Sequence, residues 1–258
     1  GIAQASMAAK RAGITMDVLV EIDVGGERCG VLPGQKAVDM AKLVEDANGL
    51  RFAGLQAYHG SIQHIRDHLE RHSAAEAAII LTRETVAALA AEGYSCGIVG
   101  GAGTGTFQTE AISGVYNELQ AGSYVFMDAD YSQNKDATGQ EDRGFQNALF
   151  VLTTVMSNPV PERVILDAGH KTCAIDSGPP QVYGLPGAIT GSLSDEHTVL
   201  NLKNVKDRPN WGENVLLIPG HCDPTVNLHS HYICVRSLHT PEATVEDIWP
   251  VAARGALN

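Results

Sequence analysis

Phe52-Ala-Gly-Leu-Gln-Ala-Tyr58 is an apolar run of β-strand length, and an Ala-rich stretch of helical character follows it at about 67–92. Three further apolar runs in the first half of the chain lie next to turns and helical segments: 18–24, 95–99 and 117–126. Strands that alternate with helices of about ten or more residues are typical of parallel βαβ units. The first half therefore predicts an α/β fold with four such units, which is half of an eight-fold (β/α)8 TIM barrel. A short open α/β sheet is the alternative.

The second half of the chain has a different pattern. Its apolar runs are short and are separated by Pro, Gly, Asn and Asp clusters: 148–155, 163–166, 215–218 and 231–235. No helical period is evident among them, which favours an antiparallel β domain. The sequence thus predicts two domains, the C-terminal half of a barrel at 1–138 and a β-rich domain at 139–258.

Composition excludes several classes of protein. The 258 residues include 44% hydrophobic side chains, enough for a sizeable core, and 18 basic against 30 acidic residues give a net charge of −12. This balance argues against nucleic-acid binding, and the absence of a long apolar run argues against a membrane span. Five scattered cysteines without a C-x-x-C pair predict free thiols and a cytoplasmic location.

The glycine-rich run Gly100-Gly-Ala-Gly-Thr-Gly105 follows a predicted buried strand. It matches neither the dinucleotide fingerprint nor a P-loop, since it lacks the third glycine of the former and the Gly-Lys-Ser/Thr of the latter. A backbone nest with hydroxyls at Thr104 and Thr106 suits one phosphate group, and Gly122-Ser123 forms a second small-residue turn one βα unit later. A plain tight βα turn explains the segment equally well.

Pro219-Gly-His-Cys-Asp-Pro-Thr225 is a candidate metal-binding segment. In an extended chain, residues two apart face the same side at a Cα separation of roughly 6.5–7 Å. His221 and Asp223 then reach one ion while Cys222 points away, and an imidazole with a carboxylate suits Mn²⁺ or Mg²⁺. His229 and His231 have the same spacing. A polar turn without metal is the alternative interpretation.

Other candidates lie near predicted strand ends. Tyr58 and His64 flank the loop after one strand, where catalytic residues of α/β barrels collect, and an imidazole exchanges protons near neutrality. Arg28 could present a cation to an anionic group or a cofactor ring, and Tyr131 could cap a ligand. Structural ion pairing, packing and surface exposure are the alternatives for these side chains.

Taken together and in this order, the motifs resemble those of D-threonine aldolases. The stretches that carry the resemblance are Val20–Asp23, Arg28–Gly30, Gln56–Tyr58, Gly100–Gly105, Gly114–Tyr124, Met127–Tyr131, Asp167–Gly169, Asp195–His197, Pro219–Pro224 and Trp249–Val251. The wider group includes 3-hydroxy-D-aspartate aldolases and eukaryotic-type D-serine dehydratases. All are pyridoxal 5′-phosphate (PLP) enzymes built like alanine racemase, with a barrel and a β domain, and the resemblance covers nearly the whole chain.

The resemblance implies a role for each candidate residue. The cofactor phosphate is expected at Thr104, Gly122 and Ser123, with Arg28 against the cofactor ring and Tyr131 also touching the cofactor. A divalent ion, Mn²⁺ or Mg²⁺, is expected at His221 and Asp223, where it grips the substrate hydroxyl. His64 is expected to be the base for that hydroxyl, with Tyr58 nearby.

The activity implied is retro-aldol cleavage of D-threonine or D-allo-threonine, as small-molecule D-3-hydroxy-amino acids, to glycine and an aldehyde by a homodimer. A 3-hydroxy-D-aspartate aldolase that releases glyoxylate is one alternative. A dehydratase is another, although related dehydratases have a cysteine where this chain has Asp223.

The family's Schiff-base lysine has no counterpart among the seven lysines of this chain. It lies on the first barrel strand, upstream of the sequence that begins with Gly1, and Lys171 belongs to the predicted β domain. A fragment of a longer enzyme is therefore expected, with an inactive cofactor- or phosphate-binding remnant as the alternative.

Overall fold

The computed structural model describes residues 1–142, 144–238 and 240–256. The chain forms two compact units: the first comprises Gly1–Tyr124 and Asn134–Asp142, and the second comprises Val125–Gln133 and the chain from 143 onward. The chain thus passes into the second unit, returns to the first and leaves it again. The boundary expected from sequence between residues 138 and 139 stays a prediction.

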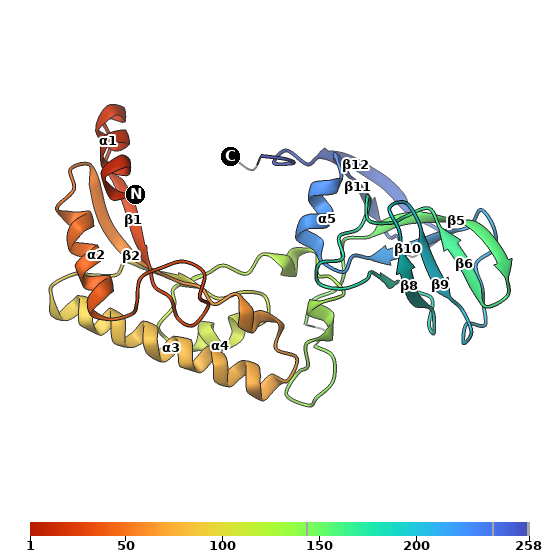
Figure 1. Cartoon of the computed structure of the whole chain (residues 1–258), viewed down its shortest axis with the longest axis horizontal. Coiled ribbons are helices and arrows are strands. Elements are labelled where there is room, and N and C mark those ends of the chain that lie inside the picture. Colours follow the sequence, from red (N-terminus) through yellow and green to blue (C-terminus); the bar gives the residue numbers. More distant parts are fainter. Residues whose placement is uncertain (143, 239, 257–258) are drawn as a thin grey trace. The chain divides into compact units, whose positions relative to one another are not determined.

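The first unit alternates helices and strands, as the sequence predicts (Figure 1). Its elements are α1 (Ile2–Ala12), β1 (Met16–Glu21), α2 (Gln35–Glu45), β2 (Leu50–Ala57), η1 (Ser61–His64), α3 (His68–Ala91), β3 (Ile98–Gly101), α4 (Phe107–Ile112) and β4 (Glu118–Leu119), followed by η2 (Ser123–Val125). The four strands form one sheet in the order β1-β2-β3-β4, and every neighbouring pair is parallel. The predicted strand at 117–126 is mostly wrong, because only Glu118 and Leu119 pair with β3 and a turn follows them.

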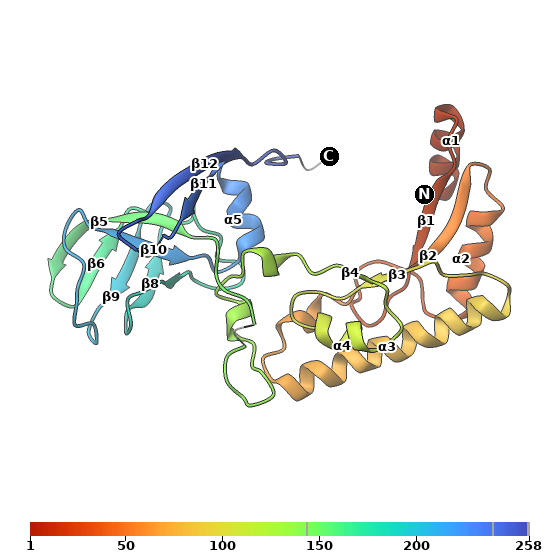
Figure 2. The ribbon, with the colours of Figure 1, turned by 180° about the vertical axis from the view of Figure 1, so that it is seen from behind.

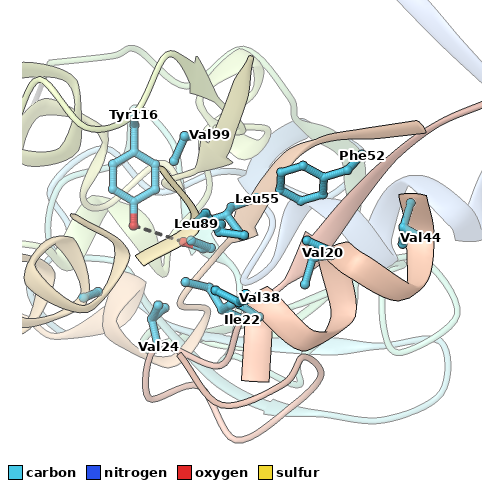
Figure 3. Packing of buried hydrophobic residues seen from close by; sticks show 14 of the residues in the cluster. Val20, Ile22, Val24, Val38, Val44, Phe52, Leu55, Leu89, Val99 and Tyr116 are labelled. Carbon is cyan, nitrogen blue, oxygen red and sulfur yellow. Dashed lines mark hydrogen bonds between the residues drawn. The ribbon is translucent and has the colours of Figure 1, made fainter. Parts of the chain in front are cut away.

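Apolar side chains between the sheet and its helices form the core of this unit. Val20 and Leu55 from the strands pack with Val38 of α2 and Leu89 of α3, and all four are buried (Figure 3). Asp67 caps the N-terminus of α3, because its carboxylate accepts hydrogen bonds from the free backbone N–H groups of the first helical turn. The core therefore holds α2 and α3 against the sheet.

The second unit is mainly antiparallel β structure, as predicted (Figure 2). Its elements are η3 (Tyr131–Gln133), β5 (Val151–Val160), β6 (Arg163–Leu166), β7 (Gln181–Val182), β8 (Ile189–Leu193), β9 (Thr198–Asn201), β10 (Asn214–Ile218), α5 (Cys222–Leu228), β11 (His231–Arg236) and β12 (Thr244–Pro250). Six strands lie in the order β7-β10-β5-β6-β9-β8, and β11 pairs with β12. Leu166, Leu200 and Leu217 are fully buried in its core.

The extended conformation expected for the segment at 219–225 is wrong beyond its first half. His221 is extended, but α5 begins at Cys222. The N–H groups in the first turn of a helix have no partner within the helix, so Pro224 fits there without loss of a hydrogen bond. The negative charge of Asp223 is favourable in the same turn because of the helix dipole. Sequence signals for a helix start were therefore present. Among the described residues, no helix is long and apolar enough to span a membrane.

Candidate active site

The candidate residues of the first unit all follow the carboxyl ends of its four parallel strands. Arg28 lies in the loop after β1, Tyr58 and His64 lie after β2, Thr104 lies after β3, and Gly122-Ser123 lies after β4. Parallel strands end at the same edge of their sheet, and ligands of α/β proteins bind at that edge. The fold therefore gathers the loops that carry these six residues.

Arg28 lies over the ring of Tyr58, with the guanidinium carbon 5.2 Å from the ring centroid. The loop that carries Arg28 is shaped by Asp23, whose Oδ1 accepts hydrogen bonds from the N–H groups of Gly25 and Glu27. These backbone hydrogen bonds hold the pKa of Asp23 below its usual value. The loop thus presents a planar cation beside an aromatic ring, an arrangement suited to stacking against a flat anionic ligand.

Thr104 is hydrogen-bonded to the residue that follows the turn at Gly122-Ser123. The Thr104 Oγ1 accepts a hydrogen bond from the Tyr124 N–H at 3.1 Å, which ties the loop after β3 to the turn after β4. A side chain added at Gly122 would meet nothing within 4 Å, so the turn has open space beside it. Hydroxyl and amide donors next to open space fit the phosphate group of PLP.

Thr106 does not share this role, contrary to the sequence-based expectation. Its side chain is buried, and its Oγ1 donates to Glu110 Oε2 at 2.6 Å while accepting from Gln63 Nε2 at 2.9 Å. The other end of the Gln63 amide accepts a hydrogen bond from the Gly105 N–H at 2.9 Å. The glycine-rich loop therefore packs on a buried polar cluster of Gln63, Thr106 and Glu110. Of these three residues, only Thr106 was considered from the sequence, and in a different role.

Glu110 is fully buried, and burial raises the pKa of its carboxyl group. Among the described residues its Oε1 has no hydrogen-bond partner, while Oε2 accepts from Thr106. Such a carboxylate is costly, because its charge has left water without a full set of donors.

The candidate metal ligands lie close together at the start of α5. His221 Nε2 is 3.5 Å from Asp223 Oδ2, and His221 Nδ1 is 2.6 Å from Asp176 Oδ2. The hydrogen bond with Asp223 and then that with Asp176 raise the pKa of His221 to about 9. The expectation that Cys222 points away is wrong, because its thiol donates to Asp223 Oδ2 at 3.3 Å.

This donor set fits a hard divalent ion. Within the part of the chain that the structure describes, no cluster of three or more His, Cys, Asp or Glu side chains forms a metal site. His221 Nε2 and Asp223 would supply two ligands, with water or substrate completing the shell. Asp176 would hold the other ring nitrogen, the usual arrangement of a carboxylate behind a metal-binding imidazole. Asp176 was missed because it lies 45 residues away and no local motif marks it.

Tyr131 belongs to the same unit as this pair and is buried. Its N–H donates to Asp128 Oδ1, and Asp128 Oδ2 accepts from the Cys222 N–H, each at 2.9 Å. Asp128 thus joins the turn that carries Tyr131 to the segment that carries His221.

The other histidines and the lysine considered in the sequence analysis have contacts elsewhere or are exposed. His229 Nε2 lies 2.9 Å from the carbonyl oxygen of Thr172, and His231 is exposed at the start of β11. Lys171 pairs with Glu196 at 2.6 Å, and both side chains are exposed.

Comparison with known proteins identifies the relatives of the chain. The family pattern for the alanine racemase N-terminal domain matches residues 2–130, and the pattern for a putative serine dehydratase domain matches residues 148–235. A solved structure of D-threonine aldolase from Filomicrobium marinum is 48% identical, with a TM-score of 0.94, and the match covers 100% of this chain and 68% of that one. The chain belongs to the alanine racemase-like family of D-threonine and 3-hydroxy-D-aspartate aldolases.

Two curated members of this aldolase family support the assignment. D-threonine aldolase of an Arthrobacter species is 44% identical over 254 residues, and 3-hydroxy-D-aspartate aldolase of Paracoccus denitrificans (strain Pd 1222) is 45% identical over 256 residues. Each match covers 98% of this chain but only 65% and 64% of the relative, so the chain spans less than two thirds of their length. The predicted family and fold class, an alanine racemase-like barrel architecture with a β domain, are confirmed.

Glu110→Gln tests the buried carboxyl group. Because burial raises the folded-state pKa, the contribution of Glu110 to stability is present below pH about 4.5 and is lost as the pH rises through the folded-state pKa. Gln does not titrate. The free energy of unfolding of the variant, relative to wild type, should therefore rise between pH 4.5 and 8, by about 1.4 kcal/mol for each unit of pKa elevation. Urea unfolding across this range measures it, with exposed Glu84→Gln as the control; an unchanging difference would contradict the assignment.

Asp176→Asn tests the carboxylate behind His221. Loss of the negative charge should lower the pKa of His221 from about 9, measured by NMR titration without metal. At pH 9.5, where proton competition is small, Mg²⁺ affinity measured by calorimetry should fall by about tenfold or more. Glu196→Gln removes a comparable exposed ion pair and should alter neither quantity. Unchanged Mg²⁺ affinity in Asp176→Asn would show that Asp176 does not support an ion site.

Proposed function

We propose that the protein is a PLP- and divalent-metal-dependent D-threonine aldolase, a carbon–carbon lyase that cleaves D-threonine and D-allo-threonine to glycine and an aldehyde. The observation that carries the proposal is the His221–Asp223 pair, 3.5 Å apart, in a member of this aldolase family. An imidazole and a carboxylate are ligands for Mn²⁺ or Mg²⁺, which suits an ion that binds a substrate hydroxyl.

The cofactor part of the proposal rests on the loops at the sheet edge. Thr104, Gly122 and Ser123 would hold the phosphate of PLP, supported by the hydrogen bond between Thr104 and the Tyr124 N–H. Arg28 would lie against the cofactor ring, and Tyr131 would also contact it. When bound, PLP supplies an electron sink conjugated to the substrate Cα, which permits cleavage of the Cα–Cβ bond.

The chain's own residues would then handle the hydroxyl proton. His221 and Asp223 would hold the divalent ion that orients the β-hydroxyl and lowers its pKa. His64 would accept the proton from the hydroxyl oxygen as the Cα–Cβ bond breaks and that oxygen becomes the aldehyde carbonyl. Tyr58, whose ring lies against the Arg28 guanidinium, would lie near His64 in the active site.

A second candidate substrate is 3-hydroxy-D-aspartate, which would give glycine and glyoxylate. The 3-hydroxy-D-aspartate aldolase of Paracoccus denitrificans supports this candidate, because it is 45% identical to the chain and the D-threonine aldolase of Arthrobacter is 44% identical. We further propose that the protein acts on small molecules as a cytoplasmic homodimer. The five cysteines, all free, fit a reducing compartment.

Removal of the ion tests the proposed function directly. In the whole enzyme, incubation with D-threonine, PLP and Mn²⁺ should release acetaldehyde, and EDTA should abolish that release. His221→Ala and Asp223→Ala should each make the residual rate insensitive to EDTA, because no ion site remains. His231→Ala, an exposed histidine on β11, is the control. Preferred release of glyoxylate from 3-hydroxy-D-aspartate would select the second candidate, and full activity in EDTA would refute the metal assignment.

His64→Gln tests the proposed base. The substitution retains polarity but cannot accept the hydroxyl proton, so kcat should fall about 10²–10⁴-fold. Mn²⁺ affinity and PLP binding should be unchanged, since neither is assigned to His64. The matched variant His170→Gln changes an exposed histidine and should keep wild-type kcat. A kcat within about threefold of wild type in His64→Gln would transfer the role of base to another group.

A further inference from the structure

Gln63 directly precedes the candidate base and is fully buried, yet nothing in the proposed reaction uses it. Its Nε2 donates to the carbonyl oxygen of His59 at 3.1 Å and to Thr106 Oγ1 at 2.9 Å. Its Oε1 accepts from the Gly105 N–H at 2.9 Å. The side-chain amide therefore bonds to the loop after β2 through Nε2 and to the segment after β3 through both Nε2 and Oε1.

The shapes of the two loops fit each other only because glycines face Gln63. A Cβ at Gly103 would overlap the Gln63 side-chain amide, and a Cβ at Gly105 would overlap the Gln63 backbone carbonyl. Gly103 thus leaves space for the side-chain amide of Gln63, and Gly105 leaves space for its backbone. This close approach explains why two positions of the run are glycine without any contact with a phosphate.

Further side-chain hydrogen bonds hold the backbone of the same two loops. Arg71 Nε donates to the carbonyl oxygen of Gly105 at 2.9 Å, and its Nη1 donates to that of Ile65 at 2.6 Å. Asn134 Nδ2 donates to the carbonyl oxygen of Gln63 at 2.9 Å. The backbone around Gln63 is therefore held independently, and the side-chain amide is the link that can be removed without freeing the whole region.

We propose that Gln63 is a positioning residue that fixes the candidate base His64 and the phosphate-binding loop relative to each other. The proposal rests on the proposed function for the roles of His64 and Thr104. A phosphate held at the loop after β3 anchors the cofactor, whereas the base comes from the loop after β2. Groups that act on one substrate from separate loops lose rate when their spacing shifts by about 1 Å.

The required side chain at this position is an amide. A carboxylate of the same size would place an acceptor against the His59 carbonyl oxygen, where Nε2 now donates. A methionine would fill the space but could neither donate nor accept these hydrogen bonds at comparable strength. Gln63→Met therefore removes the link with little change in volume. Gln63→Glu retains the shape of the side chain but replaces the Nε2 donor with an acceptor.

The test uses the 258-residue chain with two measurements. Hydrogen exchange followed by mass spectrometry reports on the peptide that contains the Gly105 amide. Equilibrium binding of PLP and of pyridoxal, which lacks the phosphate, reports on the phosphate loop through the ratio of the two affinities. Gln35→Met is the matched control, because the Gln35 side chain is exposed on α2 and donates a hydrogen bond to Asp39 of the same helix.

In Gln63→Met, we expect exchange near Gly105 to be about tenfold faster and PLP affinity about tenfold weaker, as for loss of the bond that the Gly105 N–H makes to Gln63, with pyridoxal affinity unchanged. Gln63→Glu should have at least as large an effect, and Gln35→Met none. An unchanged affinity ratio with unchanged exchange near Gly105 would overturn the proposal. So would exchange that rises uniformly across the first unit, since this would indicate a general structural role.

The two proposals fail in distinguishable ways. If the wild-type chain binds pyridoxal as well as PLP, the assigned phosphate site is wrong, while faster exchange confined to Gly105 in Gln63→Met would still establish the link between the loops. If Gln63→Met does not fold, Thr106→Val removes one of the three side-chain bonds of Gln63 with nearly constant volume. Its exchange near Gly105 should then be faster than that of wild type, and an unchanged rate would overturn the proposal.

Discussion

The common direction of β1 to β4 is the constraint on which the first unit depends. Since all four strands run parallel, their following loops meet at one edge, although the residues that they carry are spread from Arg28 to Ser123 in the sequence. The sheet has one irregularity between β1 and β2, where Val18 pairs with Phe52 but Leu19 pairs with Gly54, so that the register shifts by one residue. Gly54 has φ of 150°, and a Cβ there would overlap the carbonyl oxygen of Ile98. Glycine at this position lets β2 remain paired on both sides.

Local patterns were sufficient to predict the long helix of the first unit. The long helix α3 was expected at about 67–92 and occupies His68–Ala91, because its composition and its Asp67 cap act within a few residues. The start of α5 was misjudged because the pair at His221 and Asp223 was interpreted as a strand, although Pro224 and Asp223 suit a first helical turn. Short-range signals thus determined the elements, and where two such signals competed the helix prevailed.

The side-chain contacts of the candidate site were less predictable. His221 and Asp176 are 45 residues apart, and Gln63 and Gly105 are 42 apart, so no periodicity or spacing rule relates them. Their meeting depends on how strands and loops pack, which is a property of the tertiary structure. The resemblance to a family supplied residues that would contact a ligand directly. It supplied none of the buried groups that hold those residues in place, because such groups interact with the protein and not with the ligand.

The buried cluster beneath the glycine-rich loop also has a defined direction. Thr106 has a single hydroxyl proton, and it donates that proton to Glu110 Oε2. Its oxygen is then left to accept, which requires Gln63 to present Nε2 on that side and leaves Oε1 to face the Gly105 N–H. The acceptor at Glu110 thus agrees with the amide orientation that the His59 carbonyl oxygen and the Gly105 N–H also require. An apolar residue in place of Glu110 would avoid burying a carboxyl group, but it would leave the buried Thr106 hydroxyl proton without this acceptor. The cost of the buried carboxyl group is therefore linked to the order of the loop that is proposed to hold the phosphate.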